Sequence, residues 1–256
     1  MRHPTSRQVV RQIARLEKFV NNWRMLPATK DPRNAVFLAL LSKALNVGRA
    51  VCTLVLSGFP TEAFGLSRTL IEIYFSLRYM GSRETQERVT TYIEYGTRVK
   101  KEWFDINAKY YPERKLHLSS SHDEEMKTAA KFKSRGQWTK HGGQAKIMAL
   151  EPDGFETNDA GEPIREEFDY DALFFWTSHY VHVTVHGLTG HVAEPGRMFR
   201  VHPARSAEKE YARLALFFVV TFLTKITLQA CRGMREDQPE QILQEMFRMM
   251  NKFIKK

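Results

Sequence analysis

Apolar residues recur at helical spacing along most of this sequence, and this period constrains the fold more than any other feature. In the first such segment, about residues 6–24, apolar side chains fall at i, i+4, i+7, i+11 and i+14, namely Val9, Ile13, Leu16, Val20 and Trp23. One face of a helix collects residues at these positions. Further helices are predicted over about 33–57, 60–80, 82–110 and 206–232, and from Asp237-Gln238-Pro239 onward. The sequence therefore predicts an all-α fold, a bundle of about six to seven long helices.

One region departs from this period. Residues 111–167 are rich in Gly, Pro, Asp, Asn and Lys, apart from a short helix that a capping box of Ser121 and Glu124 opens. We interpret this stretch as a partly irregular, partly flexible insertion in the bundle. A chain of 256 residues can bury one large core. The expected organisation is a single helical domain over 1–256.

The charge balance is strongly basic. Lys and Arg number 39 against 29 Asp and Glu, a formal net charge of +10. Such a balance favours a polyanionic partner, with RNA or a nucleotide considered before a membrane surface. On the first predicted helix, one basic ridge consists of Arg7, Arg11, Arg15 and Lys18. The ridge is either a solvated face or a nucleic-acid-binding face that contacts phosphates.

The cysteines and the apolar runs bear on the cell compartment. Cys52 and Cys231 stand far apart in apolar helical segments, as buried free thiols do in a reducing cytoplasm. The longest apolar run, residues 214–223, is too short to cross a bilayer. We therefore expect a cytoplasmic protein without membrane insertion.

The stretch "WTSHYVHVTVHG", residues 176–187, holds three histidines. It falls in a predicted helical element over about 169–187, although the alternation of valines over 181–185 leaves a strand open. On a helix, His179 and His186 stand about 10.5 Å apart along the axis, too far for one metal ion. A metal shared by His182 and His186 remains an alternative, but we expect no metal and no cofactor. His182, one turn after Ser178, is the preferred candidate for proton transfer.

A second candidate site lies in "EAFGLSRTLIEIYFSLRYM", residues 62–80. Arg68 and Glu72 are four residues apart on one face of an otherwise apolar helix. They form either a structural ion pair or part of a functional site, because charges in apolar surroundings need partners.

These two stretches carry a resemblance. The Arg-x-x-x-Glu helix and the later Tyr…Ser-x-x-Val-His helix resemble those of an uncharacterised all-helical bacterial family, at Arg68, Glu72, Tyr170, Ser178, Val181 and His182. That family is similar to the HEPN (higher eukaryotes and prokaryotes nucleotide-binding) domains of toxin–antitoxin and phage-defence systems. The resemblance implies a homodimer, a cognate antitoxin or defence protein as partner, and metal-independent cleavage of RNA.

Two functions from different classes follow. In the first, a defence or toxin protein acts on RNA or a nucleotide, with Arg68, Glu72, Ser178 and His182 as catalytic residues. In the second, a non-catalytic module binds nucleic acid or a protein partner, and Arg68, Glu72 and His182 form a structural polar network. Secondary candidates are His186, and Arg197 with His202, which have the Arg-x(4–6)-His spacing of HEPN ribonucleases. Arg135 and His141 share this spacing, and chance predicts about two such pairs.

Overall fold

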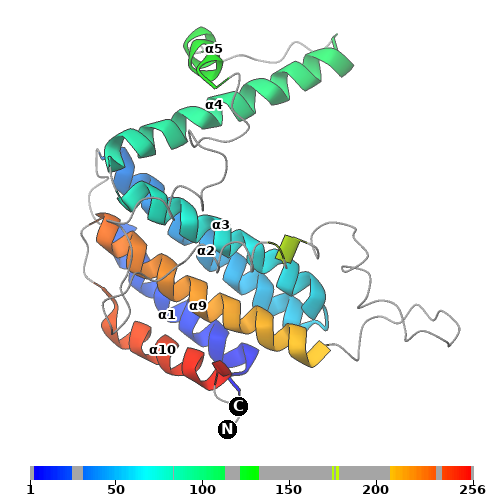
Figure 1. Cartoon of the computed structure of the whole chain (residues 1–256), viewed down its shortest axis with the longest axis vertical. Helices are drawn as coiled ribbons and strands as arrows, with labels where there is room; N and C mark the ends of the chain where they lie inside the picture. The colour runs from blue at the N-terminus through cyan, green and yellow to red at the C-terminus, as the bar shows by residue number, and fades with distance from the viewer. Residues whose placement is uncertain are drawn as a thin grey trace, which may run out of the picture.

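The structure is a computed structural model that describes residues 3–24, 31–82, 84–112, 122–132, 175, 177–178, 208–234 and 238–254. Its helices are α1 (Ser6–Arg24), α2 (Pro32–Leu56), α3 (Pro60–Ser82), α4 (Thr85–Tyr110), α5 (His122–Ala130), α9 (Glu208–Met234) and α10 (Glu240–Ile254). Within the described residues every regular element is a helix (Figure 1). The predicted all-α bundle is therefore confirmed.

Three helices form the centre of the bundle. α3 packs against α9, and α2 packs against both, while α1 and α10 lie outside them, α1 on α2 and α10 on α9 (Figure 1). The interior between them is rich in aromatic rings, such as Tyr74, which stands 5.8 Å from Phe222 between ring centroids. In α9, the hydroxyls of Thr224 and Thr227 each donate to the carbonyl one turn earlier at 2.7 Å.

The first helix begins with a reciprocal cap. The Thr5 amide donates to Gln8 Oε1 at 2.8 Å, and the Gln8 amide donates to Thr5 Oγ1 at 3.4 Å. The predicted apolar stripe is confirmed over its described part: Val9, Ile13, Leu16 and Val20 are at most 1 % exposed. The Trp23 side chain lies outside the described part of the chain. The cap and the buried stripe together determine which face of α1 points to solvent.

A close approach of three helices fixes how α1, α2 and α9 meet. A Cβ added at Gly48 would lie 2.9 Å from Leu223 Cδ1, and 3.4 Å from both Ile13 Cδ1 and Val219 Cγ1. Such contact is tighter than side chains normally accept. Gly48 therefore lets α2 approach its two neighbours closely.

The structure corrects one helix boundary. The sequence predicts a helix from residue 82, but α3 runs through Ser82 and α4 begins at Thr85. Ser82 Oγ donates to the Tyr79 carbonyl at 3.1 Å, so the serine completes α3. The break follows at Glu84, whose left-handed backbone (φ 44°) cannot continue a right-handed helix. Of the predicted insertion over 111–167, the structure describes residues 111–112, α5 and the two residues after α5. The choice between helix and strand at residues 181–186 lies outside the described residues.

α4 is attached to the bundle at one end. Arg88, only 8 % exposed, donates from Nη1 to the Tyr79 carbonyl at 2.7 Å and to Ser82 Oγ at 2.9 Å. Its guanidinium also lies 4.0 Å from the Tyr79 ring centroid. From this attachment α4 runs away from the bundle with α5 beside it (Figure 1).

Candidate functional site

The structure forms the ion pair predicted on α3. Arg68 Nε donates to Glu72 Oε1 at 3.0 Å, with the arginine side chain 22 % exposed and the carboxylate side chain 47 % exposed. Thr61 and Ser76, on the same face of α3 by helical spacing, are buried. The pair therefore stands at the margin of the interior, with its acidic member open to solvent.

The histidine partners of this pair remain predictions. The described part of the later stretch is helical at Phe175, Thr177 and Ser178; Thr177 is fully buried and Ser178 half-buried. Other predicted residues lie outside the described residues: Tyr170, Val181, His182, His186, Arg197 and His202. What the structure brings together is thus Arg68 with Glu72.

Part of the predicted basic ridge forms an exposed row on α1. Arg7, Arg11 and Lys18 are all exposed, and on a helix they fall within an arc of about 40°. This arc lies opposite the buried stripe described above. The row is about 16 Å long at the helical rise per residue, and within the described residues none of its three cations contacts an acidic side chain.

Arg15, the fourth residue of the predicted ridge, has a different role. It pairs with Glu245 of α10 and donates to Gln12 Oε1 at 3.1 Å, while the Gln12 amide donates to Glu245 Oε2 at 2.7 Å. These hydrogen bonds, from Gln12 and then from Arg15, lower the pKa of Glu245. Arg15 therefore joins α1 to α10.

A second ion pair flanks the row on its other side. Glu17 of α1 pairs with Arg49 of α2. Glu17, the acidic residue of α1, and Glu245 of α10 are thus each held by an arginine outside the row. The outward face of α1 consequently presents cations without neutralising carboxylates.

α10 extends this surface. Arg248 and Lys252 are exposed and follow Glu245 at i+3 and i+7, on the face of α10 that contacts α1. We name the set Arg7, Arg11, Lys18, Arg248 and Lys252 the basic face. The sequence did not predict that Arg248 and Lys252 belong to this face, because the spacing of residues within α10 does not show which helix lies beside it.

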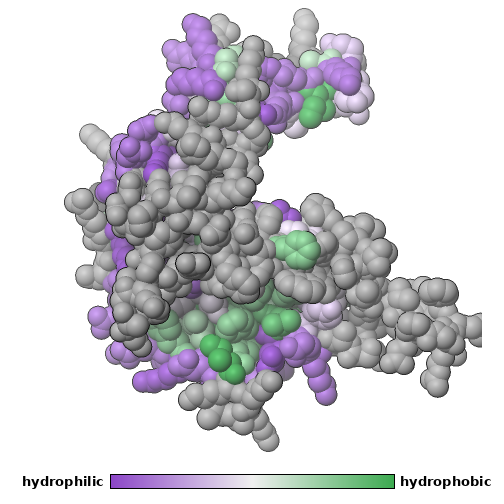
Figure 2. All heavy atoms as spheres, viewed as in Figure 1, coloured by the Kyte–Doolittle hydropathy of each residue, from purple (hydrophilic) through white to green (hydrophobic). Residues whose placement is uncertain are grey.

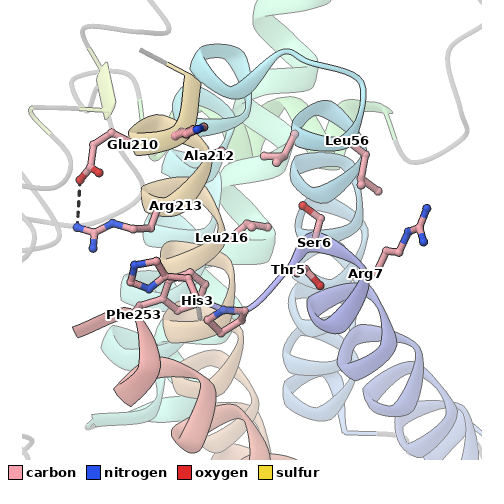
Figure 3. A pocket seen from close by; sticks show the side chains of 13 residues that line it. His3, Thr5, Ser6, Arg7, Leu56, Glu210, Ala212, Arg213, Leu216 and Phe253 are labelled. Atoms are coloured by element: carbon pink, nitrogen blue, oxygen red, sulfur yellow. Dashed lines mark hydrogen bonds and ion pairs between the residues drawn. The ribbon is translucent and has the colours of Figure 1, made fainter. Parts of the chain in front are cut away.

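A shallow pocket adjoins one end of the basic face (Figure 3). Its volume is about 730 Å³, and apolar side chains such as Leu56, Leu216 and Phe253 line it beside Arg7 and Lys209. His3 Nδ1 donates to the Lys252 carbonyl at 3.0 Å, and its ring stacks on Phe253 at 6.1 Å between centroids. This contact holds the start of the chain against the end of α10.

Two kinds of side chain bear on metal and redox chemistry, the possible metal ligands and the thiols. The described residues contain no group of three or more His, Cys, Asp or Glu side chains placed to hold a metal ion. Cys52 and Cys231 are buried free thiols, as expected. Burial raises the pKa of Cys52 to about 12, so this thiol stays protonated at neutral pH.

In the part of the chain that the structure describes, two helices have the length and composition of a membrane span, Pro32–Leu56 and Lys209–Met234. The second extends well beyond the ten-residue apolar run seen in the sequence. Both also belong to the three central helices of the bundle, and core helices of soluble proteins share this composition. The two helices are therefore weak support for a membrane location.

Comparison with known sequences gives one match. The model of a family described as "Family of unknown function (DUF5677)" matches residues 34–199. This range includes Arg68, Glu72 and Ser178, and leaves out α1, α9 and α10. No curated protein and no solved structure matches the chain.

Proposed function

The chain belongs to DUF5677, a family of unknown function, and from its own surface we propose that it binds RNA through the basic face. The observation that carries this proposal is the row Arg7, Arg11 and Lys18, whose neighbouring carboxylates are both engaged elsewhere. An aligned row of unneutralised cations attracts a polyanion and contacts successive phosphates. The choice of RNA rests on the resemblance to HEPN domains.

Binding is tested with a fluorescent single-stranded RNA titrated at several salt concentrations. Arg7→Gln/Arg11→Gln removes two phosphate contacts. In a plot of the logarithm of affinity against the logarithm of salt concentration, its slope should therefore be shallower than that of wild type by about 1.4. Affinity at low salt should fall at least tenfold, because each charge-assisted contact is lost outright. Both side chains are exposed, so the melting temperature should not change.

Lys127→Gln/Lys131→Gln is the matched control, since it removes the same charge from α5 and the residue that follows it, away from the basic face. It should change affinity less than twofold. If the two double variants lose the same RNA affinity, the effect comes from net charge alone, and the basic face is rejected as the binding site. Duplex DNA binding more tightly than RNA would reject the assignment to RNA.

A second function, metal-independent RNA cleavage, is favoured by the Arg68–Glu72 geometry. Glu72 holds the guanidinium through Nε, an arrangement that orients an arginine toward a phosphate oxygen. In this proposal Arg68 stabilises the phosphate, Ser178 orients the imidazole, and His182 serves as general acid or base. A partly exposed pair one helical turn apart contributes only about 0.3–0.5 kcal/mol to stability, so loss of activity and loss of fold are separable.

Glu72→Gln is therefore the variant that best separates loss of cleavage from loss of stability. Labelled RNA is incubated with purified protein in the presence of a chelator, and Glu72→Gln and Arg68→Ala should slow cleavage at least tenfold. The melting temperature of Glu72→Gln should stay within about a degree of wild type. Arg98→Ala, which breaks a similar pair with Glu102 on α4, should leave the rate per folded molecule unchanged. Intact RNA with wild type, or equal rates in all variants, would exclude this function.

A further inference from the structure

The far part of α4 presents an apolar face that the described structure leaves open. Near the bundle, Val89 is buried and Tyr92 packs against the core. Beyond it, Val99, Trp103, Ile106 and Tyr110 are 54, 53, 56 and 63 % exposed. Figure 2 shows hydrophobic side chains among hydrophilic ones on this projecting part of the molecule. We name these four residues the α4 seam.

α5 covers the opposite side of α4. Arg98 Nη1 donates to the Phe132 carbonyl at 2.8 Å, Lys131 pairs with Glu94 at 2.9 Å, and the rings of Tyr95 and Phe132 meet at 5.5 Å. By helical spacing the seam falls within an arc of about 60°; Arg98 and Glu94 lie well away from this arc, and Tyr95 lies just beside it. The packing of α5 therefore leaves the seam uncovered.

The spacing of the seam is that of a coiled coil. Its members are separated by 4, 3 and 4 residues, the 3.5-residue period that keeps one face of a helix against a second helix. A core-facing helix of a globular bundle normally has a wider apolar face. The seam is therefore narrow enough for one partner helix.

We propose that the α4 seam pairs antiparallel with the α4 seam of a second copy of this chain. In this register Trp103 packs against the partner's Ile106, and Val99 against the partner's Tyr110. Glu102, which also pairs with Arg98 of its own helix, then lies next to the partner's Lys109, an attraction repeated by the twofold symmetry. A parallel pairing would place Glu102 beside an uncharged asparagine at 107, so the charges favour the antiparallel arrangement.

Two further observations agree with a second copy. A Cβ added at Gly96 meets no atom within 4 Å, so α4 is also open to a partner one turn before the seam begins. α5 brings acidic residues to the same arm, with Glu125 paired to Lys100 at 2.5 Å. Over residues 85–110 and 122–132 the arm carries seven Lys and Arg against seven Asp and Glu, so it has no net positive charge to attract an anionic membrane surface. Four side chains per copy form less than a standard interface, so we expect dissociation in the micromolar range.

Sedimentation equilibrium over about 1–200 μM protein, without RNA, tests the pairing; interfaces of this size dissociate in that range. Trp103→Glu should weaken self-association at least tenfold. Phe247→Glu, which changes an exposed aromatic residue of α10, should not. Glu102→Lys should also weaken it, and Glu102→Lys/Lys109→Glu should restore it, because both charges are then reversed together.

Each contrary result has a definite meaning. A wild-type protein that stays monomeric throughout this range overturns the proposal. A dimer that Trp103→Glu does not weaken places the interface elsewhere and also overturns it. A monomer that binds vesicles of phosphatidylcholine and phosphatidylserine, and loses that binding in Trp103→Glu, assigns the seam to a membrane. Failure of the charge exchange to restore association rejects the antiparallel register.

Discussion

Replacing Gly233 with alanine is expected to lower the free energy of unfolding by about 2–3 kcal/mol, the cost of overpacking a well-filled core. A Cβ at this position in α9 would stand 2.8 Å from Cζ of Phe37 and closer still to two other ring atoms. Phe37 is fully buried, so its ring has no free space to enter. Urea unfolding followed by circular dichroism measures the loss.

Gly81 provides a control that faces the same ring. A Cβ there would lie 3.9 Å from Phe37, an ordinary van der Waals contact. Gly81→Ala should be neutral or slightly stabilising, because alanine is the better helix former. If both variants lose the same stability, the cause is loss of glycine itself, and the predicted clash with Phe37 is wrong.

Arg88→Ala is expected to lower the free energy of unfolding by about 2–3 kcal/mol, since it removes charge-assisted hydrogen bonds to groups at the end of α3. The loss should be local. Hydrogen exchange should accelerate in α4 and α5, which depend on this attachment, and not in α1 on the other side of the bundle. Exchange measured by mass spectrometry resolves these helices separately.

Ser82→Ala gives the smaller, matched change. It removes one acceptor of Arg88 and leaves the stronger bond to the Tyr79 carbonyl in place. We expect about 0.5–1 kcal/mol, typical of a single neutral partner. Equal acceleration of exchange in α1 and α4 after Arg88→Ala would show that Arg88 supports the whole bundle instead.

The helices were predictable because their period is local. The apolar stripe from Val9 to Val20 is visible in the sequence, and any apolar surface that packs against it will bury it. The sequence predicted which residues form the basic ridge on α1, but not which of them pair with another helix. Arg15 and Arg11 look equivalent in the sequence, yet Arg15 pairs with a carboxylate 230 positions away on α10, and no local pattern reveals that neighbour.

The candidate site shows the same division. The spacing of Arg68 and Glu72 predicts their contact, and the structure forms it. Whether His182 joins them remains a prediction, because a helical period places residues on a face but does not say which element covers it. Likewise the seam spacing is visible in the sequence, whereas its exposure depends on the side that α5 occupies. The buried role of Arg88 has no sequence signal, since it stands among polar residues.

The attachment of α4 at one end gives the arm the mechanics of a lever. From Val89 to Tyr110 the helix is about 30 Å long, and its contacts with the bundle lie in its first part, around Arg88, Val89 and Tyr92. A tilt of about 10° at that fulcrum would carry the tip through about 5 Å, roughly one helical pitch. Small changes in packing around Tyr79 are therefore amplified into large displacements of Trp103 and Tyr110. The fulcrum residues, more than those at the tip, determine how far the arm reaches.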